Sequence, residues 1–236
     1  MFWSRPQYAA GVSLEIVEKT MSDDKMLKQN VLAELNWEPS VTAAHIGVTA
    51  HSGVVTLTGH VGSFMEKWAA EKAASRVKGV KAVAEELEVR LPYDVKHGDE
   101  EIAAAAVNRL SWDGSVPHDA VKVTVEKGSV TLTGEVEWHY QKDAADWDVR
   151  GLLGVIRINN DITIRQRANA SNITDDIRKA LHRSWFFNPD SVTVTADGGN
   201  VRLTGSVSTW HDRQVAEDTA WAAPGAVSVV NDIAIV

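Results

Sequence analysis

The strongest constraint on the fold of this chain is a short stretch that occurs three times. It reads VVTLTGHV at 54–61, VTLTGEV at 130–136 and VRLTGSV at 201–207. Its glycine recurs after 75 residues, from Gly59 to Gly134, and again after 71 residues, at Gly205. Solenoid repeats have periods of about 20 to 50 residues, so these longer spacings indicate three repeated domains.

Each copy lies in the same sequence of predicted elements. An alternating β-branched run and a glycine turn precede the stretch, which is typical of a β-hairpin. A segment with apolar residues every three or four positions follows it and predicts a helix, which ends near a glycine before a last strand. Another such helix begins each unit. The expected fold is therefore α+β, with three tandem αββαβ domains, each a three-stranded mixed sheet covered by two helices.

The domain boundaries follow from this pattern. We expect domains at residues 23–91, 99–164 and 172–236, joined by short polar linkers. Residues 1–22 match no repeat and are expected to be a disordered extension. Their apolar run, from Tyr8 to Leu14, is short and is broken by Glu15 and Glu18, which makes a secretory signal a poor match.

Composition narrows the classes of function. The chain has no cysteine, which excludes disulfides, thiol nucleophiles and thiolate metal sites. Its formal net charge is −8, which disfavours a general nucleic-acid binder because phosphate contacts need clustered cations.

Motifs for catalysis or metal binding are missing from the sequence. The eight histidines are scattered, and no HExxH, P-loop or GxSxG pattern occurs. The set His139, Asp143 and Asp146 could ligate a metal or relay protons, but solvated helix starts explain it more simply. The asparagines at the start of the last strands, such as Asn160 and Asn231, favour a structural turn or edge role over a metal site. We expect no enzyme activity, no cofactor and no metal site.

Tryptophan is unusually frequent, with nine in the chain. Trp37 and Trp112 align just after the first predicted helix of their domains, and Trp185 lies close to the equivalent point. One interpretation is that these rings fill the gap between helix and sheet. The other is that they anchor the protein at a membrane or protein interface, where tryptophan is enriched.

The third domain has the clearest candidate for a binding surface. Cations on its first helix precede a run of aromatics, and this combination suits an anionic lipid surface. The alternative is a solvated helix face with its aromatics in the core. The candidate residues are Arg178, Lys179, Arg183, Trp185, Phe186 and Phe187.

The repeated unit, its VTLTG stretch and the later GV before a final strand resemble the BON domain family of bacterial osmotic-stress (OsmY-like) and nodulation proteins. The resemblance covers residues 23–236 in three copies. It implies that Gly59, Gly134 and Gly205 are structural glycines at a tight passage from strand to helix.

The resemblance also implies a function. Members of the family are thought to bind phospholipids or other hydrophobic partners near membranes and to respond to osmotic stress. We therefore expect a non-enzymatic module that binds phospholipid surfaces or hydrophobic ligands, with anionic membranes or proteins as its partners. The alternative is a soluble protein-interaction or chaperone-like scaffold. The weak leader pattern favours a cytoplasmic location, with a periplasmic or peripheral-membrane location as the alternative.

Overall fold

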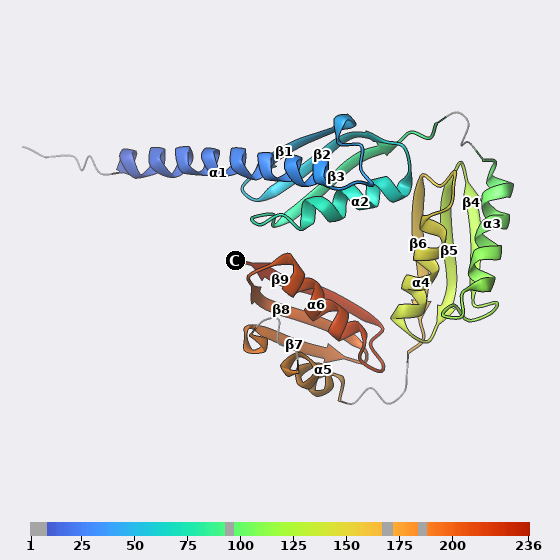
Figure 1. Ribbon diagram of the computed structural model, residues 1–236. Helices are drawn as coiled ribbons and strands as arrows, with labels where there is room; N and C mark the ends of the chain where they lie inside the picture. The colour runs from blue at the N-terminus through green and yellow to red at the C-terminus, as the bar shows by residue number, and fades with distance from the viewer. Residues whose placement is uncertain (1–8, 93–96, 167–171, 184–187) are drawn as a thin grey trace, which may run out of the picture. The chain divides into compact units, whose positions relative to one another are not determined.

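The computed structural model describes residues 9–92, 97–166, 172–183 and 188–236, and it describes side chains from residue 23 onward, Pro189 excepted. Three αββαβ units follow one another along the chain (Figure 1), which confirms the predicted fold. The first unit contains α1 (Ala9–Trp37), the 3-10 turn η1 (Ala43–His45), β1 (Ile46–His51), β2 (Val54–Val61), α2 (Phe64–Ser75) and β3 (Ala82–Val89).

The second and third units repeat this order. The second contains α3 (Asp99–Trp112), β4 (Val121–Glu126), β5 (Ser129–Val136), α4 (His139–Arg150) and β6 (Arg157–Ile164). The third contains α5 (Ile173–His182), the 3-10 turn η3 (Pro189–Ser191), β7 (Val192–Asp197), β8 (Asn200–Val207), α6 (Trp210–Trp221) and β9 (Ser228–Ile235).

Each unit has its own three-stranded sheet, with the second strand in the centre. The orders are β1-β2-β3, β4-β5-β6 and β7-β8-β9. The first two strands of each unit pair antiparallel as a hairpin. The second and third strands are parallel in domains 2 and 3, as expected when a helix connects them. The sequence had left this strand order open.

The core of each domain lies between the sheet and its two helices. The predicted apolar stripe of the first helix is buried in all three copies. The alternate residues of the hairpins are buried in domains 1 and 3, whereas those of β4 in domain 2 are half-buried. Burial is confined to one face of the sheet because side chains alternate along a strand. In domain 3 the central buried residues are Ile177, Leu181, Val194, Leu203, Ala216 and Ala220.

The repeated glycines have a structural role that differs in one respect from the expectation. Gly134 lies inside β5, opposite Val121 of β4, and not in the passage from strand to helix. Its φ is +141°, and a Cβ atom at this position would lie 2.0 Å from the carbonyl oxygen of Ala120. Gly59 and Gly205 show the same approach, at 2.1 and 2.0 Å. The glycine is required because the neighbouring backbone occupies the space of a side chain.

Carboxylates on the first helices of domains 1 and 2 accept hydrogen bonds from the hairpin turn. Asp99 accepts hydrogen bonds from the backbone N–H groups of Lys127 and Gly128, at 2.7 and 2.8 Å. Asp24 accepts one from Ser52 N in domain 1, at 2.8 Å. Ser52 and Lys127 have left-handed backbones, with φ of 51° and 49°. Asp24 and Asp99 thus tie each of these two helices to its hairpin.

Asp99→Ala is expected to destabilise domain 2 by about 1–3 kcal/mol, because two turn N–H groups lose their acceptor. Amide hydrogen exchange over β4 and β5 would measure the change. Glu100→Ala is the matched control, since Glu100 is an exposed acidic residue on the same helical turn. Equal exchange rates in the two variants would contradict the role of Asp99.

The recurrent asparagines join the second helix to the last strand. In domain 2, Asn160 Nδ2 donates to the Lys142 carbonyl at 3.0 Å, and Lys142 Nζ donates to the Ile162 carbonyl at 2.8 Å. Asn231 and Arg213 make the corresponding bonds in domain 3. These contacts support the structural role that the sequence favoured over a metal site.

The first helix of domain 1 is longer than predicted. α1 begins at Ala9, well ahead of the expected boundary at residue 23. The expectation of disorder for residues 1–22 is therefore wrong over residues 9–22, and residues 1–8 lie outside the described residues. Apart from Gly11, the segment 9–22 contains no helix breaker, and it enters the domain helix without a proline to end it.

Candidate functional site

The line along which the two helices of a domain pack, here called the helix seam, differs between the three domains. In domain 1 an ion-pair bridge closes it. Arg76, just beyond α2, lies 3.1 Å from Glu34 and 3.0 Å from Glu38, both from the α1 side. Hydrogen bonds from Ser40 and then from Arg76 hold the pKa of Glu38 below its ordinary value.

The seam of domain 2 is bridged by a different pair: Arg109 aligns with Glu34, whereas Asp148 lies three positions before the residue that aligns with Arg76. Arg109 on α3 lies 3.5 Å from Asp148 on α4. Asp148 is only 8% exposed, and its Oδ2 atom has no hydrogen-bond partner among the described residues. Burial, and next the negative charge of Asp113, raise the pKa of Asp148, while Arg109 lowers it. The net result is a raised pKa, so Asp148 binds its proton more tightly in the folded protein than in the unfolded one.

This balance predicts how the stability of domain 2 depends on pH. Because the folded-state pKa of Asp148 is raised, the ionised form is disfavoured in the fold. The contribution of this residue should therefore become more stabilising as pH falls through the folded pKa, until pH reaches the ordinary aspartate range. Asp148→Asn should remove this dependence and make domain 2 more stable near neutral pH.

Denaturant unfolding of wild type and Asp148→Asn across the acidic range, read by hydrogen exchange in domain 2, measures this effect. The difference between the two proteins isolates Asp148 from other carboxylates, such as Glu101, whose pKa is lowered by hydrogen bonds from Gly98 N–H and His97. A difference that does not change with pH would contradict the assignment.

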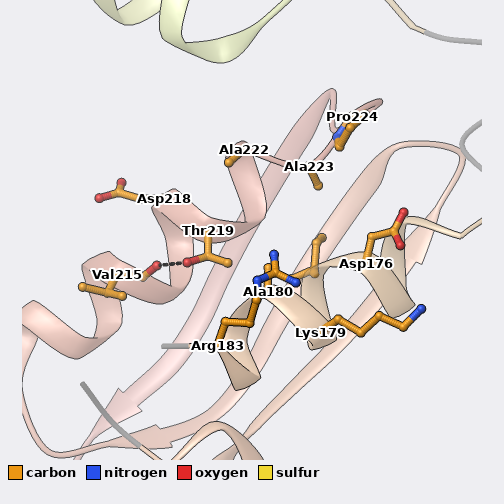
Figure 2. Close-up of a pocket in the computed structure, with 11 residues that line it drawn as sticks. Asp176, Lys179, Ala180, Arg183, Val215, Asp218, Thr219, Ala222, Ala223 and Pro224 are labelled. Carbon is orange, nitrogen blue, oxygen red and sulfur yellow. Dashed lines mark hydrogen bonds between the residues drawn. The ribbon is translucent and has the colours of Figure 1, made fainter. Parts of the chain in front are cut away.

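In domain 3 the helix seam is an open groove (Figure 2). Ala180 and Ala222 occupy the positions that correspond to Glu34 and Arg76, and Thr219 occupies that of Asp148. None of the three can form an ion-pair bridge. The groove has a volume of about 630 Å³, and its lining includes Ile177, Ala180, Val215, Thr219, Ala222, Ala223 and Pro224.

Charged side chains stand at the rim of this groove. Lys179 and Arg183 on the α5 side are exposed, and neither has an ion-pair partner among the described residues. Asp218 on α6 accepts a hydrogen bond from Gln214 at 2.9 Å. Figure 2 places Asp176 toward Pro224, at the end of the groove away from Arg183 and Val215. The site combines apolar walls with Arg183 at the end away from Asp176, and the Lys179 side chain is directed away from Arg183 (Figure 2).

The structure separates the predicted surface residues of domain 3 into three groups. Lys179 and Arg183 lie at the groove. Arg178 is instead paired with Asp175, 2.9 Å away on the same helix. Trp185, Phe186 and Phe187 lie outside the described residues.

The tryptophans after the first helices are surface residues. Trp37 is 83% exposed and Trp112 is 85% exposed. The interpretation that they fill the gap between helix and sheet is wrong for these two, because they lie on the solvent side of the helix end. Arg183 occupies the equivalent position in domain 3. The same place in each domain therefore presents a large exposed side chain.

The histidine and carboxylate set of α4 separates into two pairs, each between residues one turn apart on the helix. His139 Nδ1 lies 2.8 Å from Asp143, one turn along the helix, and Asp146 pairs with Arg150. Among the described residues, no group of three histidine or acidic side chains is placed to hold a metal ion.

The comparison with protein families matches the BON domain three times, at residues 23–90, 98–166 and 169–236. The chain belongs to the BON domain family. The three BON domains account for the repeated sheets, the recurrent glycines and most of the chain. The resemblance stated from the sequence is thereby confirmed.

One relative of this chain is the osmotically-inducible protein Y of Escherichia coli (strain K12). The two are 32% identical over 147 residues, which cover 59% of this chain and 72% of the relative. Two solved structures of CdsD, a structural protein of the type III secretion system of Chlamydia trachomatis, are also similar, at 17% identity. The matched regions cover 88% and 89% of this chain and 91% and 97% of the two CdsD chains, with a TM-score of 0.25 in each case.

Two further observations concern membranes and the origin of the groove. None of the helices in the described part of the chain is long and apolar enough to span a membrane.

Sequence reasoning missed the groove between α5 and α6. A position-by-position alignment of the repeats would have shown small residues at 180, 219 and 222, where the other domains carry bridging charges.

Proposed function

We propose that this protein is a non-enzymatic binding module of osmotic or envelope stress, and that domain 3 binds anionic phospholipid surfaces or hydrophobic ligands. The groove between α5 and α6 carries the proposal, because it is an apolar site edged by exposed cations. The similarity to an osmotically inducible protein supports a role in osmotic stress.

The charges at the groove set the expected strength of binding to an anionic membrane. Each lysine or arginine near an anionic membrane contributes about 1 kcal/mol of attraction. Arg178 already pairs with Asp175, so Lys179 and Arg183 are the cations that can act. Two such charges on a chain of net −8 give weak binding, so apolar contact along the groove has to contribute. Binding should therefore weaken with salt without disappearing.

Co-sedimentation with vesicles of anionic or neutral lipid tests the proposal. Wild type should bind anionic vesicles, and Lys179→Glu with Arg183→Glu should lower the bound fraction about tenfold or more, as the reversal of two attractive charges implies. Arg178→Gln should have a small effect. Lys25→Glu with Lys28→Glu is the matched control, since it makes the same charge change on exposed residues of α1.

Two outcomes would overturn the proposal after folding has been checked. One is equal binding by wild type and the Lys179/Arg183 variant. The other is no binding by wild type to either kind of vesicle.

The second candidate function is a soluble protein-interaction scaffold, and the exposed tryptophans favour it. Trp37 lies beside Glu34 and Glu38, and Trp112 lies beside Asp113, so their surroundings suit a protein partner better than an anionic lipid surface. Trp37→Ala with Trp112→Ala should then leave vesicle binding unchanged. A large loss of vesicle binding in that variant would count against the scaffold.

A further inference from the structure

We propose that the groove between α5 and α6 is a binding site for one single-chain anionic amphiphile, of the class of long-chain carboxylates. This inference deepens the proposed function and rests on it, because it assigns a monomeric ligand to the same groove. The chain would lie along the seam, with the carboxylate at the Arg183 end (Figure 2).

The first argument is that, among the described residues, the helix seam of domain 3 has no bridging ion pair, unlike the seams of domains 1 and 2. The same seam is crossed by Arg76 and Glu34 in domain 1 and by Arg109 and Asp148 in domain 2. Domain 3 has alanine or threonine at each of the corresponding positions. The site is therefore a local difference within a repeated fold and not a general gap between BON helices.

The second argument concerns the walls. The side chains of Ala180, Ala222 and Pro224 at the groove are hydrocarbon, and the buried Ile177 and Ala223 lie beneath them. The hydroxyl of Thr219 donates to the Val215 carbonyl of its own helix at 2.7 Å, so it does not demand a polar ligand. The volume of about 630 Å³ is within the usual range for small-molecule sites, about 300–1,000 Å³. An alkyl chain matches such walls because it gains burial without leaving a polar group unpaired.

The third argument concerns the charges. Arg183 and Lys179 have no ion-pair partner among the described residues, whereas Asp218 is hydrogen-bonded by Gln214. Asp176 is toward the opposite end, near Pro224. A carboxylate at the Arg183 end complements this distribution, since a guanidinium can donate two parallel hydrogen bonds to it. A cationic head group would meet the positive charge of Arg183 there (Figure 2).

The test uses the full chain and laurate below its micelle concentration, with binding followed by calorimetry and by NMR shifts of α5 and α6. Ala180→Glu with Ala222→Arg transplants the Glu34–Arg76 bridge of domain 1 without changing the net charge. Both positions are at least partly exposed, so longer side chains fit without entering the core. The apparent Kd for laurate should rise about tenfold or more, since the bridge occupies the path of the chain.

Two controls make the result specific. Dodecylammonium has the same chain and the opposite charge, and it should bind wild type at least about tenfold more weakly than laurate. Arg183→Gln with Lys179→Gln should remove that preference while retaining some binding through the chain. Hydrogen exchange of domain 3 verifies that each variant is folded.

The outcomes distinguish this inference from the proposed function. Laurate binding that the bridge abolishes supports the site. Laurate binding that the bridge leaves unchanged overturns the site, even where anionic vesicles still bind through Lys179 and Arg183. The absence of any laurate binding also overturns it, while the vesicle assay decides separately whether the surface binds lipid.

Discussion

Gly134→Val is expected to unfold domain 2 under conditions in which the other domains stay folded. The new Cβ atom would lie 2.0 Å from the Ala120 carbonyl oxygen, and real contacts are never that short, so the hairpin has to open. The φ of +141° adds backbone strain of about 1–3 kcal/mol for a branched residue. The combined cost should exceed about 3 kcal/mol, a large part of the stability of a small domain.

Amide hydrogen exchange along the full chain would locate the loss in β4, β5 and α4. Gly151→Ala is the matched control, because this glycine lies in the same domain with a φ of −87° and with open space where its side chain would stand. An exchange pattern for Gly134→Val equal to that of the control would contradict the close-approach explanation. Gly59→Val and Gly205→Val should act in the same way on domains 1 and 3.

Ile177→Ala is expected to destabilise domain 3 by about 2–5 kcal/mol. Ile177 is completely buried, and it lies together with Ala223 beneath the groove. Removing its side chain leaves a cavity under the groove that the neighbouring alanines are too small to fill. Hydrogen exchange in α5 and β8 would measure the change within this domain.

A double variant tests the packing explanation. Domain 2 has Ala106 where domain 3 has Ile177, and it has Leu152 where domain 3 has Ala223. Leu152 packs against the core of domain 2. Ile177→Ala with Ala223→Leu copies this arrangement and should recover part of the lost stability. A double variant less stable than Ile177→Ala would show that the two positions do not share volume.

The helices and strands of each domain could be predicted from the sequence because local apolar patterns determine them. The alternation around Val194 and Leu203 and the helical spacing of Ile177 and Leu181 define which face of each element is apolar. Burial of those faces sets the layers of each domain, although not the order of its strands. Three copies in register made the pattern unmistakable. The glycine was also recognisable, although its reason was not, because the carbonyl of Ala120 is brought beside Gly134 only when β4 and β5 pair.

The tertiary structure alone decided the site. Ala180 and Ala222 are separated by a hairpin and a helix in the sequence, and nothing local shows that they face each other across the helix seam. The exposure of Trp37 and Trp112 was equally hidden, because a residue at a helix end can turn to the core or to solvent with the same local sequence. Patterns of period two or 3.6 report the face of one element, whereas a groove depends on the side chains of two elements that meet only after folding.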